Sequence, residues 1–490
     1  MKKSSNSSIY SLLKPLLRLI ASYIVLRVLL LIGLLSGLFF SLYRYCVGLY
    51  LSHKYKHPIV FAEALDAKYC INDEIMQSYQ VLKGKCDIHK LRRRIDEQWL
   101  QPQSYNGRWT YTKLRQQLKL ELGYYFWIPQ IQFRIENHVI LHDGSQLTDK
   151  NDLRSFSSKN STLSMKNEIL WQFILVNLPE NHHILLFRAH HALMDRISMN
   201  RMYRKLFDDQ EDANISLTTN NIFSNFGFID KISFWSRLFG SAPYHFCKEL
   251  LRKEEKHILH GPRLTGNKLI GISAPMALER LKNIMKHTDG DANDVLMACV
   301  FGALRTYFIS EDQPIPSEMR LHVPIWLNTS QDQVKMENNA TTQSVLAFIN
   351  ESFNNERFIK GKTHRDREIA PILYFTHMYY KFYVNRYPVC MMKQIVDRLS
   401  SSVVVSCLEV STPKCLLGNE VIEQQIWLPE VNGVGGCGLA ITMSWDVNRS
   451  IVCAVKADLG IMKSQENVDK LVGLVGKEFD EFWNIYNGNK

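Results

Sequence analysis

The sequence lacks the residue patterns that commonly hold metal ions or nucleic acids. Its ten cysteines are scattered and form no Cys-x-x-Cys pair, so we expect no zinc or iron–sulfur site. Scattered cysteines of this kind are typical of reduced, mostly buried thiols rather than of a disulfide framework. No basic stripe interleaved with aromatic residues occurs, so nucleic acid is not an expected partner.

Acidic residues are missing from the first 56 residues, which contain eight lysines and arginines. This segment therefore contributes +8 of the net charge of +11, and the rest of the chain is nearly neutral. The same segment is also the most apolar part of the chain. A basic and apolar terminus indicates contact with anionic lipid headgroups, so membrane lipid is the expected partner of this end.

Long uncharged apolar runs are scarce, and the longest is VLLLIGLLSGLFFSLY at residues 28–43. Extended back past Arg27 to Leu19 it reaches about 25 residues, whereas a spanning helix needs about 20. We expect a membrane anchor within residues 1–56, which either spans the bilayer or enters it as a hairpin bent near Gly33 and Gly37.

A secretory signal peptide is the alternative for this segment, but Arg44 and Tyr45 stand where a small-residue cleavage site should be. With reduced cysteines and one basic anchor, the expected location is a membrane, that of the endoplasmic reticulum, with the body of the protein in the cytosol.

The rest of the chain has a globular composition in which strand and helix patterns alternate without a repeat. This mixture predicts an α/β pair of domains, with lobes at residues 57–207 and 263–490 joined by a linker and surface helix at 208–262. The expected elements are a helix at 86–100, extended structure at 126–142, strands at 170–178 and 183–191, a helix at 198–207, and a charged helix at 245–259. In the second lobe they are a helix at 291–308 and strands in MRLHVPIWL, SSVVVSCLEV, LAITMSW and IVCAVKAD, followed by a C-terminal helix.

The segment FRAHHALMDRIS, residues 187–198, has two adjacent histidines and an aspartate. If a strand runs through 191, His191 ends an apolar row and His190 lies on the opposite face with Arg188. A desolvated, neutral imidazole such as His191 would suit a general base at neutral pH. The structural alternative is a satisfied core histidine, with Asp195 capping the following helix.

Metal binding by these histidines is not expected. His183 and His191 would lie roughly 26 Å apart along one strand. The adjacent His190 and His191 point to opposite faces, and no carboxylate cluster completes a site.

Several blocks of sequence, taken together in order, resemble the wax ester synthase/diacylglycerol acyltransferase family, whose motif is HHxxxDG. The resemblance covers roughly residues 57 to 485. The blocks that carry it are HVILHDG (138–144), ILW (169–171), HHALMD (190–195), ANDVLMACVFGALRTYF (292–308), HVPIWLN (322–328), SCLEV (406–410), CGLAITMSWD (437–446) and VKAD (455–458).

The resemblance implies two similar α/β lobes of the CoA-dependent acyltransferase type, with a tunnel between them. It implies an O-acyltransferase that moves a fatty acyl group from acyl-CoA to a long-chain alcohol or diacylglycerol, making wax esters or triacylglycerol. His191 would be the base and Asp195 would hold the loop and the imidazole, while His190, Asn293 and Asp294 would support the site. Acyl-CoA would be a co-substrate, and no bound cofactor is implied.

Two departures from the family pattern leave alternatives open. Arg196 replaces the family glycine, and it would bind a CoA phosphate, narrow the tunnel or point to solvent. Cys407 stands where the family has an asparagine in a late strand. The alternative functions are therefore a non-catalytic lipid- or CoA-binding homologue and an acyltransferase for a small non-lipid alcohol.

Overall fold

The computed structural model describes most of the 490-residue chain. The described residues are 5–487, apart from 102–110, 145–149, 163–168, 179–180, 210–227, 253–254, 261–263, 289, 317–318, 327–335, 337, 339, 348–369, 400, 411, 424, 432–436 and 447–448.

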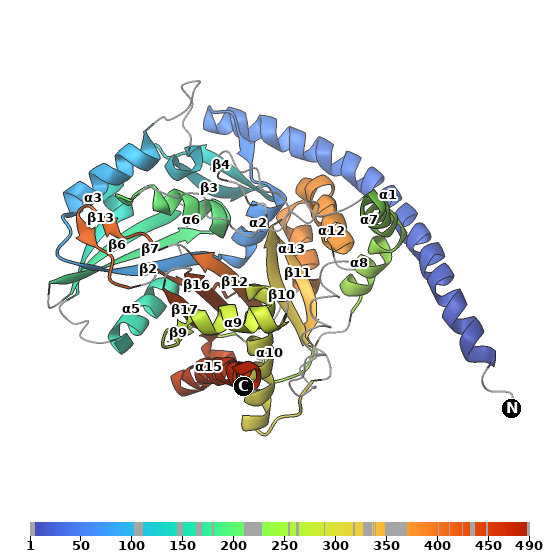
Figure 1. Cartoon of the computed structure of the whole chain (residues 1–490). Helices are drawn as coiled ribbons and strands as arrows, with labels where there is room; N and C mark the ends of the chain where they lie inside the picture. Colours follow the sequence, from blue (N-terminus) through green and yellow to red (C-terminus); the bar gives the residue numbers. More distant parts are fainter. Residues whose placement is uncertain are drawn as a thin grey trace.

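The described chain forms two α/β lobes, each built on its own sheet (Figure 1). The first lobe contains a five-stranded sheet in the order β15-β2-β7-β6-β5, and the second contains a seven-stranded sheet in the order β11-β10-β12-β16-β17-β8, with β9 also on β17. The first sheet consists of β2 (Ile75–Lys83), β5 (Val139–Asp143), β6 (Trp171–Leu178), β7 (His182–His190) and β15 (Ile426–Leu428). The second consists of β8 (Lys268–Ile272), β9 (Met276–Ala277), β10 (Met319–Trp326), β11 (Ala340–Ala347), β12 (Val403–Val410), β16 (Leu439–Asp446) and β17 (Ser450–Asp458).

Smaller sheets and the helices complete the two lobes. The smaller sheets are formed by β1 (Val60–Phe61), β4 (Tyr124–Pro129) and β3 (Gln116–Glu121), and by β13 (Cys415–Leu416) and β14 (Asn419–Glu420). The helices are α1 (Ser5–Tyr55), α2 (Ala64–Asn72), α3 (Ile88–Ile95), η1 (Asp96–Leu100), η2 (Thr112–Arg115), α4 (Ile135–His138), α5 (Lys150–Thr162), α6 (Arg196–Arg204), α7 (Phe228–Gly240), α8 (Ala242–Leu250), α9 (Leu278–Thr288), α10 (Ala292–Ser310), α12 (Ala370–Phe382), η4 (Val384–Arg386), α13 (Val389–Arg398), α14 (Leu459–Met462) and α15 (Gln465–Asn487).

Each lobe has its own hydrophobic core. In the first lobe, buried aromatic rings of the central strands β6 and β7 pack against η1 and α6, as in the contacts of Phe187 with Trp99 at 5.7 Å and with Tyr203 at 5.8 Å. In the second lobe, α10 and α15 pack together over the sheet. Although α10 is long and apolar enough to cross a membrane, it is mostly buried in this core.

The boundary at residue 263 does not separate the lobes completely. Strand β15 comes from the second half of the chain but pairs antiparallel with β2 of the first sheet. Trp427 of β15 is fully buried in the core of the first lobe. Residues 426–428 of the predicted 263–490 domain therefore belong to the first sheet, where they pair with the edge of β2.

Most elements expected around the histidine segment are confirmed. The strands at 170–178 and 183–191 are β6 and β7, which pair antiparallel, and the helix at 198–207 is α6, which begins two residues earlier. Two expectations are wrong. A short helix, α4, interrupts the extended segment 126–142, and the charged helix at 245–259 ends at Leu250. The expected linker falls mainly on 210–227, outside the described residues.

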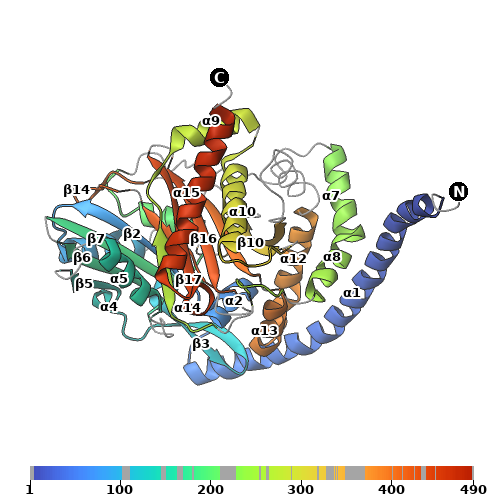
Figure 2. The ribbon, with the colours of Figure 1, turned by 90° about the horizontal axis from the view of Figure 1, so that it is seen from below.

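The apolar N-terminal segment forms one unbroken helix, α1, so the hairpin bent near Gly33 and Gly37 is wrong. The helix lies along the body beside α7, α8 and η4 (Figure 2). Its C-terminal part packs on the small sheet, where Val47 and Leu51 join the ring of Phe126. Gly33 serves packing, since a Cβ there would overlap the ring of Tyr383.

Substitution of these glycines tests how α1 sits on the body. Gly33→Ala should destabilise the purified full chain, because overpacking costs about 1–3 kcal/mol and the gain in helix propensity is at most about 1 kcal/mol. At Gly37 the added Cβ would lie 3.4 Å from Arg386, so Gly37→Ala should be neutral or stabilising. Thermal unfolding in detergent measures the difference. Identical melting of the two variants would contradict the docking of α1.

Candidate active site

The two adjacent histidines lie where β7 ends and turns toward α6. The strand ends at His190, one residue earlier than expected, and the turn is fixed by backbone hydrogen bonds from His191 N–H to the Glu74 carbonyl and from Leu193 N–H to the His190 carbonyl. Asp195 then caps α6, accepting a hydrogen bond from Ser198 N–H at 2.8 Å. The predicted cap is therefore confirmed.

The imidazole of His191 is buried and held on two sides. The ring of Tyr69 stacks on it at a centroid distance of 3.6 Å and an angle of 11°. On the other side, Nδ1 of His191 lies 3.2 Å from Oδ1 of Asn338. The amide nitrogen of Asn338 donates to Asp66 Oδ1 at 2.8 Å and to the His191 carbonyl at 3.0 Å.

This arrangement fixes the tautomer of His191. Because the Asn338 nitrogen donates to two oxygens, its Oδ1 must be the acceptor that faces the imidazole. Nδ1 of His191 therefore carries the proton, and Nε2 has the free lone pair. Burial also lowers the pKa of His191, so the ring is neutral at pH 7. A neutral imidazole with a free Nε2 is what a general base requires.

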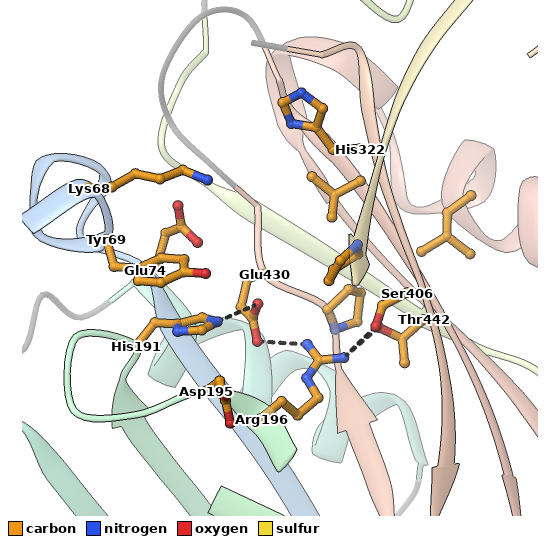
Figure 3. A pocket seen from close by; sticks show the side chains of 14 residues that line it. Lys68, Tyr69, Glu74, His191, Asp195, Arg196, His322, Ser406, Glu430 and Thr442 are labelled. Carbon is orange, nitrogen blue, oxygen red and sulfur yellow. Dashed lines mark hydrogen bonds and ion pairs between the residues drawn. The ribbon is translucent and has the colours of Figure 1, made fainter. Parts of the chain in front are cut away.

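Arg196 points into the space in front of this imidazole (Figure 3). Its guanidinium donates from Nη2 to Glu430 at 2.6 Å and from Nη1 to Ser406 Oγ at 3.2 Å and Thr442 Oγ1 at 3.4 Å. The other oxygen of Glu430 lies 3.7 Å from Nε2 of His191. Of the three alternatives for Arg196, solvent exposure is therefore excluded, and the side chain narrows the space between the lobes.

The cavity in front of the imidazole has a volume of about 50 Å³, enough for a few water molecules. Both lobes contribute to its wall (Figure 3). The lining residues are Lys68, Tyr69, Glu74, His191, Asp195, Arg196, His322, Pro324, Val404, Ser406, Pro429, Glu430, Ile441 and Thr442.

Charged groups concentrate at this junction. Burial alone would raise the pKa of Glu430, but Arg196 and His191 more than compensate and lower it. Burial lowers the pKa of Lys456 to about 7, and its ammonium donates to Gln77 Oε1 of the first lobe at 3.0 Å. The two lobes therefore contact each other near His191 through buried polar side chains.

The other residues expected at the site lie outside the cavity wall. His190 Nδ1 accepts from Ala192 N–H at 3.1 Å and so supports the turn. Asp294 forms a capping box with Asp291 at the start of α10, and neither it nor Asn293 lines the cavity. Their supporting role stays a prediction. No cluster of three potential metal ligands occurs among the described residues.

The late strand β12 places Ser406, not Cys407, in the cavity wall. The neighbouring Cys407 is partly buried and packs against the core of the second lobe. Alternation along a strand explains the difference, because successive side chains point to opposite faces. On the cavity side, this strand therefore presents the hydroxyl of Ser406, which accepts a hydrogen bond from Arg196.

Comparisons with known proteins support the fold. No protein-family model and no curated protein sequence matches this chain. Among solved structures, the wax ester synthase/diacylglycerol acyltransferase from Marinobacter aquaeolei VT8 has a TM-score of 0.54 at 15% identity, over 87% of this chain and 100% of that one. The first condensation domain of the calcium-dependent antibiotic synthetase has a TM-score of 0.55 at 10% identity, over 86% and 96%.

A third similar structure is a mutant starter condensation domain of rhizomide synthetase in complex with C8-CoA and Leu-SNAC. Its TM-score is 0.53 at 11% identity, over 88% of this chain and 95% of that one. The chain therefore has the two-lobed fold shared by wax ester synthase/diacylglycerol acyltransferase and condensation domains. The resemblance expected from the sequence is confirmed as a likeness of fold.

The pH dependence of any turnover should follow the protonation of the buried His191 imidazole. Because the pKa of His191 is lowered and the neutral form is the base, kcat/KM should stay level down to about pH 6.5 and fall only below it. Asn338→Leu removes an acceptor that stabilises the imidazolium, so it should move this fall to lower pH and reduce the plateau about ten-fold. Asn283→Asp on α9 is the control. A fall of kcat/KM centred above pH 7 would contradict the assignment of His191 as the general base.

Proposed function

We propose that the chain is a membrane-associated O-acyltransferase that moves a fatty acyl group from acyl-CoA to the hydroxyl of a long-chain alcohol or diacylglycerol. The observation that carries this proposal is the buried, neutral His191, whose Nδ1 proton is fixed by Asn338 and whose Nε2 faces a cavity between two lobes. The shared fold with an acyltransferase supports it.

In the proposed reaction, Nε2 of His191 takes the proton of the acceptor hydroxyl. The oxygen attacks the thioester carbonyl and forms a tetrahedral intermediate. This intermediate collapses to the ester, and the C–S bond to CoA breaks. The departing thiolate takes the proton from His191, so the base is regenerated. Asp195 contributes by capping α6 and holding the turn after the imidazole.

In this conformation the cavity beside His191 is too small to hold a substrate. An acyl chain does not fit in about 50 Å³, so substrate binding requires that Arg196 and Glu430 rotate away or that the lobes separate. Because the pair is buried, separating it leaves two charges that need new partners. The pair is therefore expected to limit how readily long acyl chains reach His191.

A second candidate is a non-catalytic lipid- or CoA-binding protein. The observation that favours it is the Arg196 guanidinium, which occupies the space in front of His191 with three hydrogen-bonding partners. Turnover above background by the purified chain would eliminate this candidate.

For the location, we propose the membrane of the endoplasmic reticulum with the body on the cytosolic side. Helix α1 is long and apolar enough to cross a membrane, and it carries basic residues and no acidic one. All ten cysteines are free thiols, which fits a reducing compartment.

Removal of the base tests the chemistry directly. His191→Ala should lower turnover of acyl-CoA with hexadecanol, dioleoylglycerol or a short-chain alcohol by about 10²–10⁴-fold, the usual contribution of a general base. His287→Ala on α9 is the matched control, because that ring is exposed and is not among the residues that line the cavity. Thin-layer chromatography of radiolabelled product measures the rate. Equal rates in His191→Ala and the wild type would refute the proposed base.

Removal of the ion pair tests the closed site. The double variant Arg196→Gly/Glu430→Gln should raise kcat/KM for palmitoyl-CoA relative to butyryl-CoA by about ten-fold, because it frees the space that a long chain needs. The single Arg196→Gly should instead destabilise the protein by about 3–5 kcal/mol, since it leaves Glu430 buried without its partner. An unchanged ratio of the two substrates would contradict a limiting role for this pair.

A further inference from the structure

A second cavity, which shares no lining residue with the cavity beside His191, lies between α1 and the segment that joins α12 to η4. Its volume of about 520 Å³ falls within the range of about 300–1,000 Å³ that is usual for ligand sites. Figure 2 shows α1 running along this side of the body. The groove is lined by Leu30, Gly33, Leu34, Gly37, Leu38, Ser41, Phe382, Tyr383 and Arg386.

The walls of this groove are apolar over most of its length. Three leucines of α1 and the ring of Phe382 form them. Glycine at both positions lets Tyr383 and Arg386 approach α1 closely, so these two side chains line the groove directly against the helix. An extended hydrocarbon chain lying parallel to α1 therefore fits the shape and the polarity of the groove.

One end of the groove is cationic. Arg386 lies beside Gly37, with Ser41 one turn further along α1. Among the residues that the structure describes, no hydrogen bond or ion pair is recorded for the Arg386 side chain, and no acidic residue lines the groove. A second arginine, Arg44, lies close by and donates to the carbonyl of Asn385. This end is complementary to an anionic group.

The groove also adjoins a large exposed apolar surface. On α1, Leu31, Leu35 and Phe39 are each about 60% exposed. On α7, which contacts α1, Trp235 and Phe239 are about half exposed. Exposed apolar side chains next to basic residues are typical of a membrane-facing side.

We propose that this groove binds one anionic membrane lipid, with an acyl chain along α1 between Leu30 and Ser41 and the headgroup phosphate on Arg386. The guanidinium offers a planar fork of donors that matches phosphate, and the tail leaves the groove onto the apolar surface of α1 and α7. The inference does not depend on the chemistry at His191. A bound lipid would hold α1 against the body and set the body at a fixed height on the bilayer.

The test uses the purified full chain in detergent and native mass spectrometry after addition of dioleoylphosphatidic acid or dioleoylphosphatidylcholine. The wild type should retain phosphatidic acid preferentially. Arg386→Gln should reduce that retention about five-fold, the usual effect of one basic contact at a lipid surface. Lys381→Gln, which removes an exposed charge outside the groove, is the matched control and should change nothing.

A second pair of variants tests the hydrocarbon part. Leu34→Trp fills the groove and should lower retention of both lipids, whereas Leu35→Trp, at a neighbouring and equally exposed position that does not line the groove, should not. Circular dichroism confirms that each variant is folded. Equal loss in Arg386→Gln and Lys381→Gln, or displacement of the lipid by millimolar inorganic phosphate, would overturn the proposal.

Discussion

The ion pair between Arg196 and Glu430 is the interaction on which the arrangement of the two lobes around His191 depends. Arg196 begins α6 of the first lobe, and its guanidinium reaches Ser406 and Thr442 on adjacent strands of the second. A buried pair of this kind contributes little net stability compared with apolar packing, but it is costly to break by removing one partner. The ion pair therefore specifies how the two lobes contact each other and which molecules fit beside the His191 imidazole.

The elements around the site were predictable because their signals are local. The alternation in β7, the turn after it and the Asp195 cap follow from the order of neighbouring residues. The partners of His191 and Arg196 have no such signal. Asn338 lies 147 positions from His191, and Glu430 lies 234 positions from Arg196. Only the fold brings them together, so an isolated asparagine and an isolated glutamate gave no indication of a role.

The N-terminal helix shows that the role of a glycine, too, is not predictable from its neighbours in the sequence. In an apolar run, Gly33 and Gly37 are compatible with a bend, a turn or close packing, and the sequence alone does not distinguish these. The outcome depends on Tyr383, some 350 positions away, whose ring needs the space. Likewise, the two faces of β12 had to be assigned before it was clear that Ser406 faces the cavity and Cys407 faces the core.

The crossing of β15 into the first sheet has a consequence for biosynthesis. During translation, the edge of β2 stays unpaired until residues 426–428 have left the ribosome, long after the rest of the first sheet has been made. An open sheet edge invites pairing with other chains. The nascent protein therefore carries an aggregation-prone edge for most of its synthesis, a period in which chaperones would protect it.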